Sequence, residues 1–230
     1  MNTQLSSNGA LAIFVKTPGL SPIKTRLAAS LGPVRTLEFY QLAVNALKAV
    51  MLKLKEEIPN LELYFAVAEQ EGMNSSLWAG FPTIWQGEGL LGTKLSNVYD
   101  QLLEKHSFVA FMGADSPHLA FSQIYKAILT VENSKKTDFT IGKTDDGGFY
   151  FFCGGTSIPK SSWEKIVYST ENTAKDLMDE FGSIANFREL SNSFDVDTFE
   201  DLRRYSEEDF PLFNLLNEQL QLIYWARSLK

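Results

Sequence analysis

Short apolar runs alternate with longer amphipathic stretches along most of the chain. Continuous apolar runs, typical of strands buried on both faces of a sheet, occupy residues 11–15, 61–67 and 108–112. Shorter strands are expected at residues 83–85, 139–141, 149–152 and 186–190. Apolar positions three and four apart predict helices at residues 33–57, 91–105, 121–131 and 172–181, from about 198, and again from 211.

This alternation is typical of βαβ units and predicts an α/β fold with a mainly parallel sheet. No Pro/Gly/Ser-rich linker divides the sequence, so we expect a single domain over residues 1–230. Its core should span about 11–205, with a C-terminal helix at about 211–228. Ligands of such sheets bind outside the carboxyl ends of the strands, and most polar motifs of this chain directly follow predicted strands.

The composition of the chain argues against some classes of binding partner. The formal net charge of -7 makes nucleic acid an unsuitable partner, because an acidic surface repels a phosphate backbone. No run approaches the ~18 apolar residues of a membrane span, and the N-terminus does not read as a signal peptide, so we expect a cytoplasmic protein that does not bind membranes. The single cysteine, Cys153, follows an apolar segment and is interpreted as buried and inert.

The amphipathic tail has two interpretations: it packs on its own chain, or it forms a homodimer. The apolar positions concerned are Phe213, Leu216, Leu220, Ile223 and Tyr224.

Three basic side chains, Lys16, Lys24 and Arg26, follow the first predicted strand on one loop and the start of a helix. Backbone N–H groups at a helix start favour an anion, so this loop could neutralise a di- or triphosphate. The alternative is a solvated basic loop. The Gly-Lys-Ser/Thr ending of a P-loop is absent.

Carboxylates follow later predicted strands. Asp115 lies just beyond a strand end, where it could hold Mg²⁺, which often takes one or two carboxylates plus substrate phosphates. A helix cap at Asp115 and Ser116 is the alternative. Asp195 and Asp197 would point to one side of an extended segment, which makes both metal candidates. Thr198 and Asp201 fit a capping pattern.

A third polar cluster comprises Asp145, Asp146, Gly147 and Gly148. Two carboxylates before a glycine pair suit a tight turn with a substrate close to the backbone, although a bare hairpin turn has the same sequence. His118 is close enough to Asp115 in the chain to touch a substrate, with a structural role as the alternative.

In chain order, five motifs resemble a bacterial family of uncharacterised glycosyltransferase-like proteins. This family is related to nucleotide-diphospho-sugar transferases and is often described as associated with radical-SAM proteins. The resemblance covers roughly residues 11–205 and implies a GT-A-type fold, a Rossmann-like three-layer α/β/α sandwich around a mixed, mainly parallel sheet. The motifs are Phe14-Val-Lys-Thr-Pro18 with Lys24-Thr-Arg-Leu27, Gln86-Gly-Glu-Gly-Leu-Leu-Gly92, Gly113-Ala-Asp-Ser-Pro-His-Leu119, Asp145-Asp-Gly-Gly-Phe-Tyr150 and Asp195-Val-Asp-Thr-Phe-Glu-Asp-Leu202.

The resemblance also implies roles for individual residues. The first loop would hold the nucleotide's phosphates, and the segment from Gln86 to Thr93 would contact its base. Asp115, with Asp195 or Asp197, would bind Mg²⁺ or Mn²⁺. The implied nucleotide-binding residues are Lys16, Thr17, Lys24, Thr25, Arg26, Gln86, Gly92 and Thr93.

Three functions follow, in order of preference. The first is a metal-dependent transferase, acting on a nucleotide-activated substrate by glycosyl transfer from a sugar nucleotide to a small-molecule acceptor. Lys24 and Arg26 would share the phosphate charge, and Asp145 or Asp146 would orient the acceptor or act as its base. The second is a guanylyltransferase-like nucleotidyltransferase joining NTP to a phosphorylated acceptor. The third is a non-catalytic nucleotide-binding protein.

Overall fold

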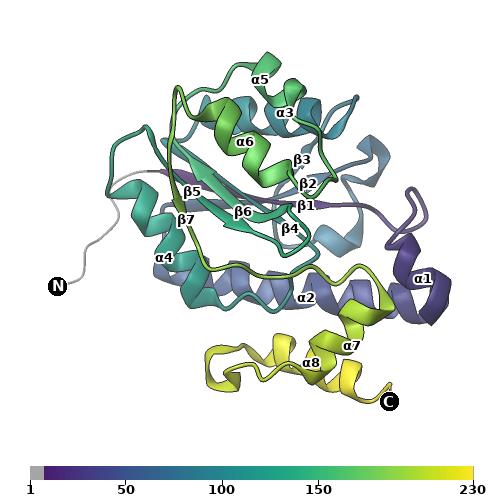
Figure 1. Ribbon diagram of the computed structural model, residues 1–230. Helices are drawn as coiled ribbons and strands as arrows, with labels where there is room; N and C mark the ends of the chain where they lie inside the picture. The colour runs from purple at the N-terminus through teal and green to yellow at the C-terminus, as the bar shows by residue number, and fades with distance from the viewer. Residues whose placement is uncertain (1–7, 230) are drawn as a thin grey trace.

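A seven-stranded sheet organises the protein. The computed structural model describes residues 8–229, with strands in the order β3-β2-β1-β4-β6-β5-β7 (Figure 1). β6 runs antiparallel to both of its neighbours, and all other neighbouring strands pair in parallel. The expected mixed, mainly parallel sheet is therefore confirmed. The strands are β1 Gly9–Val15, β2 Leu61–Val67, β3 Thr83–Trp85, β4 Phe108–Gly113, β5 Asp138–Lys143, β6 Phe149–Gly154 and β7 Asn186–Glu189.

The helices fall close to the ranges that apolar spacing predicts, with short elements added between them. α1 and α5 have no predicted counterpart as separate helices, and neither do the 3₁₀ turns at Gln70–Gly72, Ser76–Trp78 and Leu212–Asn214. The helices are α1 Thr25–Leu31, α2 Pro33–Glu57, α3 Leu91–Leu103, α4 Phe121–Glu132, α5 Lys160–Lys165, α6 Thr173–Phe181, α7 Phe199–Glu207 and α8 Asn217–Arg227.

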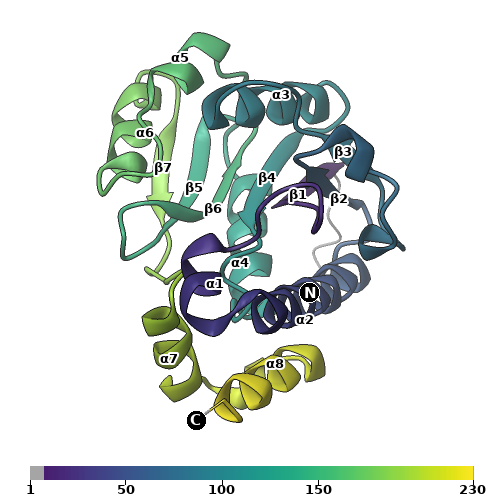
Figure 2. The same ribbon diagram turned by 90° about the vertical axis from the view of Figure 1, so that its right-hand side faces the viewer.

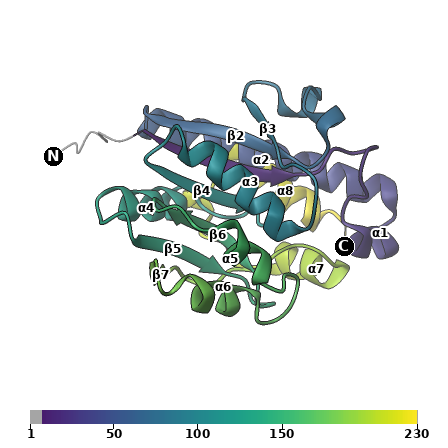
Figure 3. The same cartoon turned by 90° about the horizontal axis from the view of Figure 1, so that it is seen from above.

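Helices cover both faces of the sheet, which confirms the expected three-layer α/β/α sandwich. α2 and α4 pack on one face, and α3, α5 and α6 pack on the other (Figures 1 and 3). Side chains of β1 alternate between the two cores, with Leu11 and Ile13 on the α2 side and Ala10 and Ala12 on the α3 side. This alternation explains the continuous apolar run, because both faces of the strand are buried.

The C-terminal segment adds an outer layer that the strand pattern did not predict. α8 packs against α2 and α7, and its Leu222 and Ile223 are fully buried in a third apolar cluster (Figure 1). The tail therefore packs on its own chain, while Phe213 remains 89% exposed. The helix expected from residue 211 starts at Asn217, after a 3₁₀ turn. No helix within residues 8–229 is long and apolar enough to cross a membrane.

The connections place a topological switch point between β1 and β4. From β1 the chain moves outward to β2 and β3, then returns to form β4 on the opposite side of β1. Ligands of open α/β sheets bind in the crevice that such a reversal leaves at the carboxyl ends. Figure 2 looks onto this edge, with α1 and the loop before it towards the viewer. Because β6 is antiparallel, its first residues reach the same edge.

Candidate functional site

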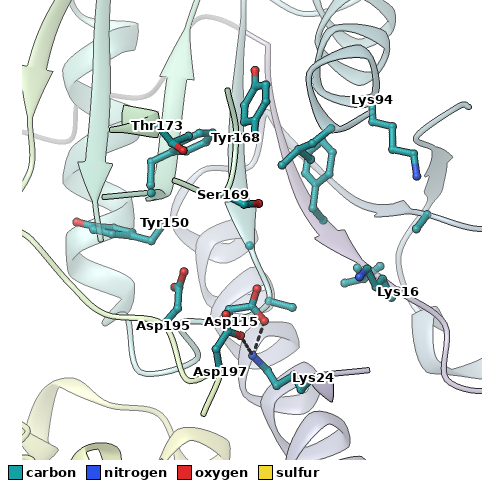
Figure 4. A pocket seen from close by; sticks show the side chains of 18 of the residues that line it. Lys16, Lys24, Lys94, Asp115, Tyr150, Tyr168, Ser169, Thr173, Asp195 and Asp197 are labelled. Atoms are coloured by element: carbon teal, nitrogen blue, oxygen red, sulfur yellow. Dashed lines mark hydrogen bonds and ion pairs between the residues drawn. The ribbon is translucent and has the colours of Figure 1, made fainter. Parts of the chain in front are cut away.

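A cleft of about 1010 Å³ lies at the carboxyl ends of β1 and β4. Its size is at the upper end of the range for small-molecule sites, which are roughly 300–1,000 Å³. The walls come from the loop after β1, the start of α3, the loop after β4, the start of β6, the segment between α5 and α6, and the segment before α7. Figure 4 shows how the side chains of these elements converge.

Lys24 forms ion pairs with Asp115 and Asp197 at the floor of the cleft. Its Nζ lies 2.5 Å from Asp115 Oδ1 and 2.9 Å from Asp197 Oδ1, and these are the dashed lines of Figure 4. Arg26 Nη2 donates to the other oxygen of Asp197 at 2.7 Å. The Lys24 side chain is only 4% exposed, whereas that of Arg26 is 67% exposed. The predicted basic loop and two of the predicted metal ligands therefore meet, but as ion pairs.

Hydrogen bonds fix the loop that carries these cations. The hydroxyl of Tyr40, on α2, accepts from Lys16 N at 3.1 Å and donates to Lys16 O at 2.7 Å. Thr17 N donates to Glu69 Oε2 at 2.8 Å. Burial, the largest effect, raises the pKa of the Tyr40 hydroxyl, which stays protonated and able to donate. The exposed Lys16 side chain thus projects from a fixed backbone.

Asp195 lies beside the ion pairs and is bonded to Ser116 instead of a cation. Ser116 Oγ donates to Asp195 Oδ1 at 2.5 Å. Desolvation by burial, reinforced by the nearby charge of Asp115, raises the pKa of the Asp195 carboxyl to about 7. The pKa of Asp197 is lowered, because Lys24 and Arg26 outweigh the opposing effect of burial. The pKa values of these two carboxylates, which the sequence offers no reason to distinguish, are therefore shifted in opposite directions.

The cleft has two chemically different sides. Lys16 and Lys94 lie on the side formed by β1 and α3 (Figure 4). Aromatic and hydroxyl side chains line the opposite side, next to Asp195. They are Tyr150, Tyr168, Ser169 and Thr173. A polyanion would thus meet cations at one end, and a polar acceptor would meet hydroxyls at the other.

The structure brings most of the predicted site residues into this cleft. The loop after β1, the end of β3, the loop after β4 and the segment before α7 all contribute, although these segments are far apart in sequence. The predicted residues that line the cleft are Lys16, Lys24, Thr25, Arg26, Gln86, Asp115, Asp146, Gly148, Asp195 and Asp197. Their placement is compatible with the predicted roles, which stay predictions.

Three residues of the implied nucleotide site lie outside the cleft lining. Thr17 is buried beneath the loop, with its backbone held by Glu69. Gly92 faces α5, where an added Cβ would lie 2.4 Å from the Trp163 carbonyl oxygen, so its small size serves helix packing. Thr93 Oγ1 donates to Glu164 Oε1 at 2.9 Å.

Three predicted substrate residues likewise do not line the cleft, and their roles stay predictions. Asp145 pairs with Arg204 at 2.8 Å and does not line the cleft. Gly147 has a φ of +89°, and an added Cβ would lie 2.0 Å from the Glu171 carbonyl oxygen, so the close neighbour is this chain and not a ligand. His118 is buried, stacks on Phe194 and contacts Ser193 Oγ through Nε2 at 2.9 Å.

Sequence reasoning missed Lys94 and the segment from Tyr168 to Thr173. Lys94 looks like an ordinary polar position of an amphipathic helix, and only the packing of α3 turns it to the cleft. The segment between α5 and α6 does not follow a strand. The rule that ligands bind beyond strand ends therefore did not predict that it lines the cleft. One unusual feature there is the positive φ of Ser169, +62°, which sequence does not reveal.

The carboxylates do not form a ready divalent-cation site as they are arranged. Among residues 8–229, no group of three or more Asp, Glu, His or Cys side chains has the geometry of a metal site. Lys24 holds one oxygen of Asp115 and one of Asp197, and Ser116 holds one oxygen of Asp195. Mg²⁺ or Mn²⁺ therefore does not fit between Asp115 and Asp197 while Lys24 keeps this position.

Comparisons with known proteins agree with the fold. The model of a bacterial family described as "Uncharacterized protein conserved in bacteria (DUF2064)" matches residues 51–170, more than half of the chain. A Desulfovibrio desulfuricans G20 protein provisionally named a nucleotide-diphospho-sugar transferase superposes with a TM-score of 0.79 at 19% identity, covering 96% of this chain and 98% of that one. No curated protein matches the sequence.

More distant solved structures share the same architecture. The 4-diphosphocytidyl-2C-methyl-D-erythritol synthase of Anaerococcus prevotii has a TM-score of 0.52 at 10% identity, over 84% of this chain and 94% of its own. A CMP:2-keto-3-deoxy-manno-octonic acid synthetase complexed with CTP gives the same TM-score and identity, over 86% and 96%. At these identities the similarity establishes the Rossmann-like fold.

Proposed function

The chain belongs to the bacterial family DUF2064, and within that family we propose that it is a transferase acting on a nucleotide-activated substrate. The observation that carries the proposal is the two-sided cleft at the switch point between β1 and β4. One side presents cations suited to phosphates, and the other presents hydroxyls and carboxylates suited to a polar acceptor. The named activities of the similar structures are of this class.

The nucleotide is assigned to the side formed by β1, β2, β3 and α3. Lys16 and Lys94 approach the cleft there, and within residues 8–229 no carboxylate lies at salt-bridge distance from either, so their charges are available to phosphates. Gln86 is less free than the sequence indicates, because its amide nitrogen donates to Val15 O at 3.3 Å and Ala66 O at 2.8 Å. We assign Gln86 to fixing the strand ends beneath the nucleotide.

The acceptor is assigned to the side lined by Tyr150, Tyr168 and Thr173. For glycosyl transfer, the bond from the anomeric carbon to the diphosphate breaks and the acceptor hydroxyl bonds to that carbon. The hydroxyl proton passes to a carboxylate, and a nucleoside diphosphate leaves. Asp146 is the predicted base that lines the cleft, and Thr144 Oγ1, at 2.5 Å, and Gly148 N, at 3.3 Å, orient its Oδ1.

A nucleotidyl transfer is the second candidate, favoured by the similarity to the two cytidylyl-type synthases. In that reaction the acceptor phosphate attacks the α-phosphorus of NTP and pyrophosphate leaves. The two reactions use the same cationic side of the cleft and differ in the leaving group. This difference makes them separable in one assay.

The test incubates the protein with a panel of sugar nucleotides or NTPs, with acceptor pools, and with or without Mg²⁺ or Mn²⁺. Release of nucleoside diphosphate with a glycosylated product supports the first reaction, and pyrophosphate supports the second. Binding without turnover on any pair would instead support the non-catalytic alternative.

A matched pair of variants locates the nucleotide. Lys94→Met should weaken nucleotide binding about tenfold, the loss of one charge-assisted contact, while Lys126→Met, an exposed lysine outside the cleft, should not. Equal affinities for both variants would refute the assigned side.

A further inference from the structure

The carboxylate pair Asp115 and Asp197 already holds a cation supplied by the chain. Lys24 Nζ lies at 2.5 and 2.9 Å from one oxygen of each, so the two oxygens share a single positive centre. The three residues come from the start of α1, the end of β4 and the segment before α7. A positive centre between oxygens of two carboxylates is the arrangement expected of a bound metal ion.

Lys24 is held in place by an unusual backbone conformation and by burial of its side chain. Its backbone is left-handed, with φ 40° and ψ 57°, a conformation that costs free energy for a residue other than glycine. The side chain is 4% exposed and its Nζ lies 5.9 Å from the centre of the Phe39 ring. A lysine that served only as a surface charge would need neither the strained backbone nor the burial.

The surrounding contacts keep the two carboxylates together. Val196 N donates to Asp115 O at 2.9 Å, so the segment that carries Asp197 is bonded to the loop that carries Asp115. Arg26 takes the second oxygen of Asp197. Lys24 and Arg26 together balance the formal charges of the two carboxylates. A divalent ion added to this group would face two positive charges in a partly buried place.

We propose that the Lys24 ammonium is the resident cation of the Asp115–Asp197 pair, and that a divalent cation binds these carboxylates only by displacing it. The free protein then has weak affinity for Mn²⁺ or Mg²⁺. Removal of the ammonium exposes two adjacent carboxylates that lack this counter-ion, which strengthens their attraction for a divalent ion.

The test is a Mn²⁺ titration of the protein alone, without nucleotide, followed by the electron paramagnetic resonance signal of free Mn²⁺. Lys24→Met keeps an unbranched side chain, one heavy atom shorter, and removes its charge. We expect it to bind one Mn²⁺ at least about tenfold more tightly than the natural chain. Lys126→Met is the control for net charge and should bind as the natural chain does. The double variant Lys24→Met with Asp115→Asn should lose the gain.

Two results would overturn the proposal. One is equal Mn²⁺ affinity of the natural chain and Lys24→Met, and the other is a gain that persists after Asp115→Asn. Should Lys24→Met fail to fold without metal, its recovery of a cooperative thermal transition on addition of Mn²⁺ supports the proposal, and no recovery overturns it. Since no donor or acceptor is present, failure here leaves the proposed transferase activity intact.

Discussion

His118 should make the stability of the protein depend on pH between about 6.5 and 3. The residue is 7% exposed, and burial, with a smaller contribution from the charge of Arg204, lowers the pKa of His118 from 6.5 to about 3. Below pH 6.5 the unfolded chain binds a proton at this position that the folded chain excludes. The stability contributed by neutral His118 is therefore present above pH 6.5 and is lost as the pH falls towards 3.

The size of the effect follows from the two pKa values. At pH 5 the unfolded imidazole is mostly protonated and the folded one is neutral, which costs about 2 kcal/mol relative to pH 8. The comparison is with His118→Gln, whose amide does not titrate and can keep the bond to Ser193. This substitution changes packing at every pH equally, so only the pH-dependent part of the difference reports the proton.

The assay is urea unfolding of both proteins at several pH values from 8 to 5. The natural chain should lose about 2 kcal/mol relative to His118→Gln over this range. Parallel dependence of the two free energies of unfolding on pH would show that His118 is protonated in the fold, and would refute the reasoning. His106 is unchanged in both proteins, so its titration cancels from the difference.

Three further substitutions test the framework around the cleft. Gly147→Ala should destabilise the protein by at least about 2 kcal/mol in urea unfolding, because φ is +89° and the added Cβ would meet Glu171; a neutral change would contradict this turn. Thr198→Ala removes the N-cap of α7, whose hydroxyl accepts from Asp201 N at 3.2 Å, and should cost about 1 kcal/mol; an unchanged urea midpoint would argue against the cap. Trp163→Ala empties a fully buried position and should cost roughly 3–5 kcal/mol by thermal or urea unfolding, whereas less than about 1 kcal/mol would mean that α5 is not packed as described.

Local pattern was sufficient for most of the secondary structure. The strand at Leu61–Val67 and the helix at Pro33–Glu57 end where the apolar pattern places their ends. A strand buried on both faces gives a continuous apolar run, and a helix buried on one face gives apolar residues three and four positions apart. Both patterns can be recognised from residues that are close together in the sequence. The short helix Lys160–Lys165 escaped prediction because only Trp163 of its residues is buried, which is too little to create a period.

The residue types at the cleft floor could also be predicted, because carboxylates in the loops after strands and a basic loop after the first strand are sequence features. Which of these residues pair with one another could not be predicted. Lys24 lies 91 residues from Asp115 and 173 from Asp197, and only the order of the strands brings the three together. The same holds for His118 and Asp145, whose contacts with Ser193 and Arg204 could not be read from the sequence.

The sequence by itself therefore determined most of the elements, the class of fold and the chemical groups available in the loops after the strands. The tertiary structure decided which of those groups face one another, and hence that the cation between Asp115 and Asp197 is Lys24. The reason is physical. Periodicity records which face of an element is buried, whereas an ion pair depends on where the chain places two distant elements.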